Sequence, residues 1–131
     1  MRTLLIISFI FFTAFTSAQT GTTKAKLSAA SYDFGTVKSG KVLKYDLFVK
    51  NTGKNPLVIS MVTSSKSSVS PQWKQAGILP GNEGLIRLYI TTLGFWGERN
   101  VTIEVQYNDD GSGPLRFKLK FKVAPSNDEE F

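Results

Sequence analysis

Two stretches of the sequence decide the fold: Asp33-Phe34-Gly35-Thr36-Val37-Lys38-Ser39-Gly40 and Asn51-Thr52-Gly53-Lys54-Asn55-Pro56-Leu57-Val58-Ile59. Each joins an apolar strand pattern to a turn that is marked by Gly, Asn or Pro. Phe34 lies between a polar residue and a flexible glycine. We therefore expect Phe34 to be a buried aromatic anchor where a strand crosses between two sheets.

The turn residues of these stretches have predicted structural roles. Gly35, Gly40 and Gly53 suit turns that need a positive φ or a close approach of the backbone. Asn51 is expected to cap a turn through its side chain, and Pro56 fixes the entry into the next strand. These residues indicate a scaffold and carry no chemistry of their own.

Apolar and polar residues alternate through most of the chain, which is the period-two pattern of half-buried strands. An N-terminal strand and a weaker one before Pro80 bring the count to about seven, the number expected for an immunoglobulin-like sandwich. The chain is therefore predicted to be an all-β, immunoglobulin-like β-sandwich of about seven antiparallel strands. The predicted strands cover residues 24–28, 43–49, 57–61, 72–78, 85–90, 101–107 and 115–123.

The first 18 residues have the layout of a cleaved secretory signal. Met1-Arg2 gives a positive start, residues 4–12 are almost all apolar, and Thr16-Ser17-Ala18 supplies the small residues of a cleavage site. The apolar run is too short to span a bilayer, which takes about 20 apolar residues. We expect residues 1–18 to be removed, leaving no transmembrane span in an exported protein that is periplasmic or extracellular.

The rest of the chain is predicted to be one domain, residues 19–124, followed by a tail. Residues 125–131 include three consecutive acidic residues and read as an acidic C-terminal tail. The domain is large enough to form a core without covalent staples.

The composition restricts the chemistry. The chain contains no Cys and no His, which removes thiol nucleophiles, His acid–base catalysis and the usual transition-metal ligands. We therefore expect no cofactor, no metal and no catalytic site. A formal net charge of +6 weakly favours anionic partners without naming one. No specific binding of nucleic acid is expected.

The loop Leu93-Gly94-Phe95-Trp96-Gly97 is the first candidate binding site. Two large aromatic residues lie between glycines at a strand connection, where recognition often occurs. One ring is expected to close the end of the core. The other, for which Trp96 is the better candidate, would be exposed and available to a partner.

A basic strand face is the second candidate. Arg116, Lys118, Lys120 and Lys122 alternate with apolar residues and therefore share one face. They could meet an anionic polymer or lipid headgroups. The simpler interpretation, which we favour, is a solvent face whose lysines discourage edge-to-edge pairing.

The order of the motifs resembles a bacterial exported family of unknown function with an immunoglobulin-like fold, akin to the abnormal-spindle, major-sperm-protein and hydin domains. The matching positions are Asp33, Phe34, Gly35, Val37, Gly40, Asn51, Gly53, Pro56, Leu57, Ile59, Pro80 and Gly81. Many members carry Cys-Gly-Cys near the end of the third strand. This chain has Ser64-Ser65-Lys66-Ser67-Ser68 there, so a thiol or metal role is not available at that position.

The sequence thus favours an exported, non-enzymatic binding or structural module of the bacterial envelope that acts through loops or strand edges. Its partner would be an envelope protein or an anionic envelope component. The alternative is a module that binds polyanions or lipid headgroups through the basic strand face. A hydrolase is the least favoured function, because neither His nor Cys is present.

Overall fold

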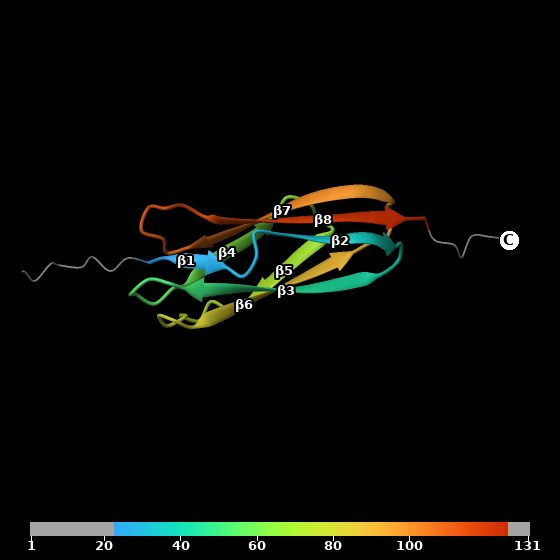
Figure 1. Ribbon diagram of the computed structural model, residues 1–131. Helices are drawn as coiled ribbons and strands as arrows, with labels where there is room; N and C mark the ends of the chain where they lie inside the picture. Colours follow the sequence, from blue (N-terminus) through green and yellow to red (C-terminus); the bar gives the residue numbers. More distant parts are fainter. Residues whose placement is uncertain (1–22, 126–131) are drawn as a thin grey trace, which may run out of the picture.

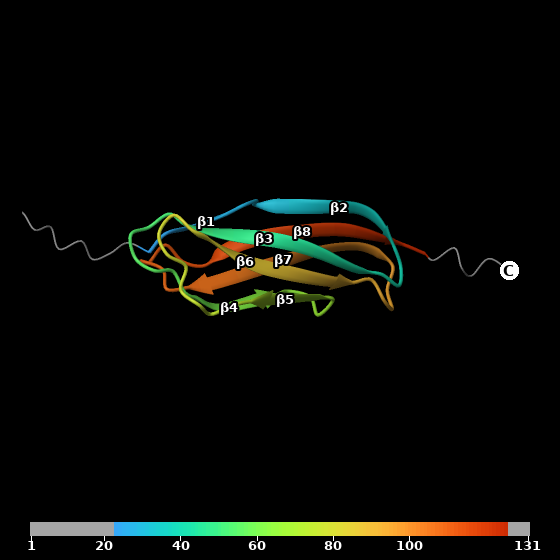
Figure 2. The ribbon, with the colours of Figure 1, turned by 90° about the horizontal axis from the view of Figure 1, so that it is seen from below.

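The computed structural model describes residues 23–125, which form two four-stranded sheets packed face to face. One sheet has the strand order β1-β3-β6-β5 and the other has the order β2-β8-β7-β4 (Figures 1 and 2). No helix in this part of the chain is long and apolar enough to cross a membrane. The strands are β1 (Ala25–Leu27), β2 (Ser31–Lys38), β3 (Val42–Asn51), β4 (Ile59–Ser64), β5 (Val69–Trp73), β6 (Glu83–Thr91), β7 (Gly97–Tyr107) and β8 (Leu115–Ala124).

The architecture confirms the predicted all-β sandwich, with two differences. There are eight strands in residues 23–125, and one pair, β2 with β8, is parallel. Both differences have one cause, because the N-terminal segment changes sheets between Leu27 and Ser31. β1 pairs antiparallel with β3, and the chain then crosses over and continues as β2 alongside β8. The crossing therefore lies before Phe34 rather than at it.

The core lies between the two sheets and is formed by the alternating apolar residues. Leu47 and Val49 of β3, for example, are fully buried, whereas their neighbours Phe48 and Lys50 face outward. β8 shows the same alternation over its whole length, and the rings of Phe117 and Phe121 are fully buried. Burial of such side chains is the main force that holds the two sheets together.

Phe34 is only half-buried, which corrects the expectation of a buried anchor. Its ring packs at the margin of the core, against Tyr32 at a centroid distance of 4.9 Å and against Tyr45 at 6.2 Å. β2 is an edge strand of its sheet and has a bulge between Asp33 and Thr36. Phe34 therefore has strand neighbours on one side only and cannot be covered completely.

Two of the three turn glycines have the positive φ that the prediction allowed for. Gly35 and Gly40 have φ values of +69° and +80°, a conformation that other residues adopt only with strain. Gly53 does not have a positive φ. Its amide instead donates to the side-chain oxygen of Asn51 at 3.0 Å, so this turn is held by the Asn51 side chain.

Candidate functional site

At one end of the sandwich, Asn51 joins two loops to the end of β3. Its side chain is fully buried, and its Nδ2 donates to the backbone oxygens of Asn55 at 2.7 Å and Ile78 at 2.8 Å. The backbone oxygen of Asn51 accepts from the amide of Gly81, in the turn that follows Pro80. This confirms the predicted capping role of Asn51 and extends it from one turn to two.

A second buried polar residue, Thr92, organises the opposite end. Its Oγ1 accepts from the Lys41 amide at 2.7 Å and lies 2.8 Å from the backbone oxygen of Lys38. The backbone oxygen of Thr92 accepts from the Ser39 hydroxyl at 3.2 Å. Thr92, the first residue after β6, thereby fixes the start of the β6–β7 loop to the β2–β3 turn. Both connections lie at the end of the molecule where β8 finishes (Figure 1).

The β6–β7 loop places its two aromatic rings in opposite environments, as predicted. Phe95 packs against the core, with its ring centroid 6.2 Å from that of Phe121. The guanidinium of Arg99 covers Phe95 at 4.6 Å from the ring centroid. Trp96, by contrast, is 74% exposed. The loop is therefore anchored by one ring and presents the other to solvent.

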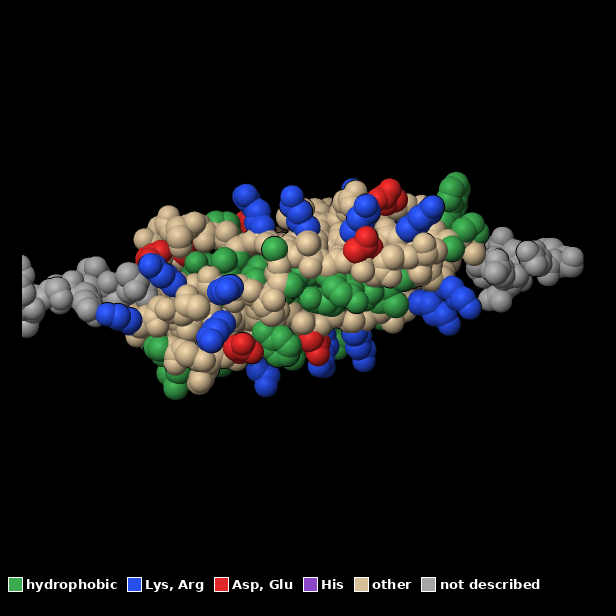
Figure 3. Space-filling view, viewed as in Figure 1, with side chains coloured by type: hydrophobic (Ala, Val, Ile, Leu, Met, Phe, Trp, Pro, Cys, Tyr) green, Lys and Arg blue, Asp and Glu red, His purple; other side chains and the backbone are tan. Residues whose placement is uncertain are grey.

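Trp96 is accompanied by two further exposed apolar side chains at the same end. Leu93, in the same loop, is 65% exposed, and Val42, at the start of β3, is 61% exposed. Val42 is paired in register with Thr91, two residues before Leu93. We call Val42, Leu93 and Trp96 the end patch. Figure 3 shows hydrophobic side chains projecting at this end of the molecule, with Lys and Arg side chains beside them.

The basic face of β8 is correctly predicted as a face, but not as a strand edge. β8 lies between β2 and β7, so its lysines cannot discourage edge-to-edge pairing. The real edges on the described part of the chain are β1, β5, β2 and β4, although β1 covers only the last part of β3. The interpretation of these lysines as protection of an edge is therefore wrong.

Acidic side chains on β7 interrupt this basic face. Lys120 Nζ lies 3.0 Å from Glu98, and Arg116 Nε lies 3.7 Å from Glu104. The hydrogen bond from Lys120 to Glu98 raises the pKa of Lys120 and keeps it charged. Lys118 lies between these pairs, Lys122 lies beyond them, opposite Glu98 in register, and both lysines are exposed. The face is thus a mixed-charge surface rather than a continuous cationic strip.

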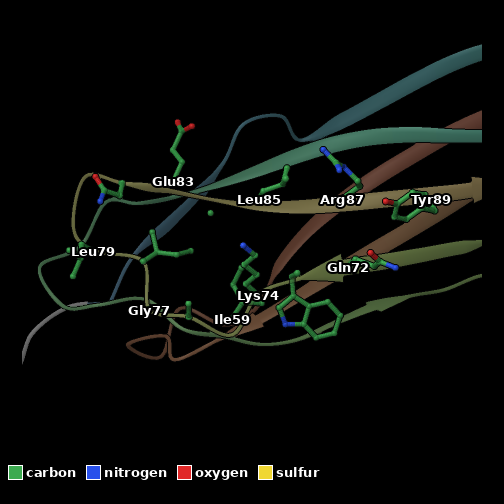
Figure 4. A pocket seen from close by; sticks show the side chains of 14 residues that line it. Ile59, Gln72, Lys74, Gly77, Leu79, Glu83, Leu85, Arg87 and Tyr89 are labelled. Atoms are coloured by element: carbon green, nitrogen blue, oxygen red, sulfur yellow. The ribbon is translucent and has the colours of Figure 1, made fainter.

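A groove with a volume of about 610 Å³ lies on the other sheet, between β6 and the connection that leads into it (Figure 4). Leu85, Arg87 and Tyr89 line it from β6, and Trp73 lines it from β5. The Trp73 ring packs against the core, and its Nε1 is buried without a hydrogen-bond partner within residues 23–125. Arg87 is already held by Asp46, at 2.8 Å between Nε and Oδ1, and this hydrogen bond lowers the pKa of Asp46.

Residues 25–123 match the family described as protein of unknown function (DUF1573). The chain belongs to this family. Its membership confirms the resemblance that the motif residues indicated. No curated protein matches the chain.

Several solved structures share the fold. A protein of unknown function from Porphyromonas gingivalis W83 is 25% identical with a TM-score of 0.66, covering 86% of this chain and 51% of that one. The chain thus spans about half the length of that protein. The ASH/PapD-like domain 7 of human CEP192 is 12% identical with a TM-score of 0.67, covering 81% of this chain and 89% of that one.

An enzyme also contains a region of this fold. The family 123 glycoside hydrolase from Clostridium perfringens is 12% identical with a TM-score of 0.65, and the match covers 79% of this chain but 27% of the hydrolase. At this identity the likeness shows the fold alone.

The sequence identified the loop from Leu93 to Gly97 and singled out Trp96, but it gave no sign that Val42 lies at the same end. The exposure of Leu93 and Val42 follows only from the packing of the loops. Thr92 carried a weak signal, since it is a polar residue that continues the buried alternation of Leu88 and Ile90.

Proposed function

We propose that the protein is an exported, non-enzymatic binding module that engages its partner through the end patch. The observation that carries this proposal is the 74% exposure of Trp96 on a loop whose other aromatic ring is anchored in the core. A partner would be an envelope protein or an anionic envelope component. The site of action would be the periplasm or the cell exterior, after loss of residues 1–18, which lie outside the described residues.

The end patch is not needed to complete the core. Phe95 already closes the core beside Phe121, and the bonds of Thr92 already fix the neighbouring turn. Leu93 and Trp96 leave most of their surface in water, which is unfavourable for apolar side chains in isolation. Exposed Trp residues are common among the side chains that dominate binding energy. A binding role explains this exposure better than a structural role.

Catalysis has little support in the described residues. They contain no group of three or more Asp or Glu side chains that could hold a metal ion. The hydroxyl of Ser64, beside Lys66 in the serine-rich loop, bonds to the backbone of Lys66 and not to its amine. A hydroxyl nucleophile would need an adjacent base, so this loop is better explained as a connection between β4 and β5.

The structure supports polyanion binding by the basic face of β8 less well than the sequence does. Glu98 and Glu104 neutralise two of its four cations, and Asp33 on β2 lies opposite Lys120 in register. An extended polyanion that lies along β8 would be repelled by these carboxylates beside every second cation. Binding that depends on the face alone would therefore be weak and strongly sensitive to salt.

The test is capture of envelope components by the chain without residues 1–18, followed by cross-linking and identification. Trp96→Ala should abolish specific capture and leave the unfolding temperature unchanged. Leu79→Ala is the matched control, because Leu79 is 58% exposed in the β5–β6 connection at the Asn51 end. Equal loss of capture in both variants, or no loss in either, would remove the end patch as the binding surface.

A further inference from the structure

We infer that the end patch and the cations around it bind the surface of an anionic phospholipid membrane. This inference rests on the proposed function and names the ligand of the same surface. It requires two independent features at one pole of the molecule: apolar side chains that can enter the interface, and cations that can meet lipid phosphates.

The apolar feature is a short projecting loop. Leu93 and Trp96 lie within four residues and are both mostly exposed, and Val42 adds a third apolar side chain from β3. Trp is favoured at membrane interfaces because its ring is apolar while its N–H remains able to donate to water or headgroups. Leu93 and Val42 have no polar atoms in their side chains, so only an apolar environment would improve their solvation.

The loop is held firmly enough to act as a wedge. The Phe95 ring inside the loop packs on the core, and Arg99 lies over that ring. Thr92 binds the start of the loop to the β2–β3 turn. The backbone around Trp96 is therefore anchored by its neighbours, so little backbone entropy would be lost when Trp96 enters an interface.

The charged feature consists of Lys38 and Lys41 in the β2–β3 region, Arg99 on β7 and Lys122 near the end of β8. All four lie at the pole where Lys38 is paired in register with Ala124 and Gly97 with Val123. Within residues 23–125, Glu98 is the acidic residue at this pole, and it is engaged by Lys120 at 3.0 Å. Cations around an apolar tip match an anionic membrane surface, which attracts each of them about fivefold in binding constant.

A soluble polyanion fits this pole less well. Phosphate or sulfate groups would satisfy the cations but would leave Leu93 and Val42 in water. A membrane satisfies both features at once, because its headgroups carry the charge and its interface accepts the apolar side chains. Two such features together are also what stable attachment of a peripheral protein requires.

The probe is Trp96 fluorescence in the Trp73→Phe chain without residues 1–18, so that Trp96 is the remaining tryptophan. In buffer its emission should be red-shifted and readily quenched by iodide. Vesicles of phosphatidylcholine mixed with phosphatidylglycerol should shift the emission to the blue and protect it from iodide. Vesicles of phosphatidylcholine alone should bind at least tenfold more weakly, because the cations gain little from them.

Two pairs of substitutions distinguish an effect of the cations at this pole from an effect of the protein's net charge. Lys38→Gln with Lys41→Gln should weaken binding to the anionic vesicles by about 25-fold, at about fivefold for each cation. Lys26→Gln with Lys50→Gln removes the same charge from the opposite end, where these two lysines face each other across β1 and β3, and should have little effect. Trp96→Ala, measured by vesicle sedimentation, should reduce binding at least tenfold.

The lipid inference is overturned if anionic vesicles leave Trp96 emission unchanged, or if Trp96→Ala and both lysine pairs bind vesicles as the unchanged chain does. It is also overturned if soluble heparin binds as tightly as the vesicles and independently of Trp96. Loss of envelope capture on Trp96→Ala without vesicle binding would leave the proposed binding module intact and replace the lipid by another partner. Failure of both measurements would remove the proposed function as well.

Discussion

At the end of the sandwich that carries Asn51, the loops bond to one another through buried polar groups, whereas at the end that carries Thr92 the loops are anchored and then turn apolar side chains outward. The Asn51 end is closed by hydrogen bonds of Asn51, Gly81 and Asn108. The Nδ2 of Asn108 donates to the backbone oxygen of Pro56 at 3.0 Å. The Thr92 end is closed by Thr92 and Phe95 but continues into Leu93 and Trp96.

This difference separates structural motifs from binding residues. The residues that match the family pattern at the Asn51 end satisfy buried donors and acceptors, and their loss would leave those groups unpaired. Trp96 is 74% exposed and has no hydrogen-bond partner within residues 23–125. Substitution of the buried Asn51 should therefore lower stability, whereas substitution of the exposed Trp96 should lower binding and leave stability unchanged.

The largest expected effect is from Asn51→Ala. It removes three hydrogen bonds of a fully buried side chain and leaves the backbone oxygen of Ile78 without that donor. The free energy of unfolding should fall by about 3 kcal/mol, because unsatisfied buried groups retain their desolvation cost. Urea denaturation measures the loss. Asn100→Ala, at an exposed position of β7, is the control and should change stability little.

Thr92→Val should have the next largest effect. Valine keeps the shape of the side chain but removes the hydroxyl that accepts from Lys41 and meets the backbone oxygen of Lys38. We expect a loss of about 2 kcal/mol in the free energy of unfolding. The β2–β3 turn should also show faster amide hydrogen exchange. A stability equal to that of the unchanged chain would mean that the Thr92 end is held by Phe95 alone.

Phe34→Ala tests a motif residue that belongs to neither end. A fully buried Phe would cost about 3–5 kcal/mol on truncation, but Phe34 is half-buried, so we expect about 1–2 kcal/mol. Phe117→Ala supplies the comparison, since Phe117 belongs to the same sheet and is fully buried. Chemical denaturation of both variants is the measurement. Equal losses would show that Phe34 carries more of the core than its exposure indicates.

The smallest expected effect on stability is from Trp96→Ala. Its ring is 74% exposed, so truncation should change the free energy of unfolding by less than about 0.5 kcal/mol. Thermal and urea unfolding of this variant should coincide with those of the unchanged chain. A loss above 1 kcal/mol corresponds to a change of about 5-fold in the folding equilibrium. Such a loss would place Trp96 with the structural residues and remove the contrast between the two ends.

Local patterns in the sequence predicted the parts of the site that depend on nearest neighbours. Asn51 was identified because an Asn followed by Gly caps a turn within a few residues, and the structure places its Oδ1 3.0 Å from the Gly53 amide. Trp96 was identified because glycines on both sides hold two adjacent rings in a loop, where both cannot point into the core. Such relations involve residues that are close together in the sequence, so the sequence shows them directly.

The sequence by itself determined the fold class, the alternating faces of the strands and the loop that carries Trp96, because a period of two residues reports which side of a strand is buried. Only the tertiary structure decided that β2 runs parallel to β8 and that β8 is an inner strand whose cations pair with carboxylates of β7. It also decided that Val42, Leu93 and four cations lie at one pole. These features bring together segments far apart in the chain. Their positions depend on which strands pair and in which register, and alternation within one strand does not specify its neighbour.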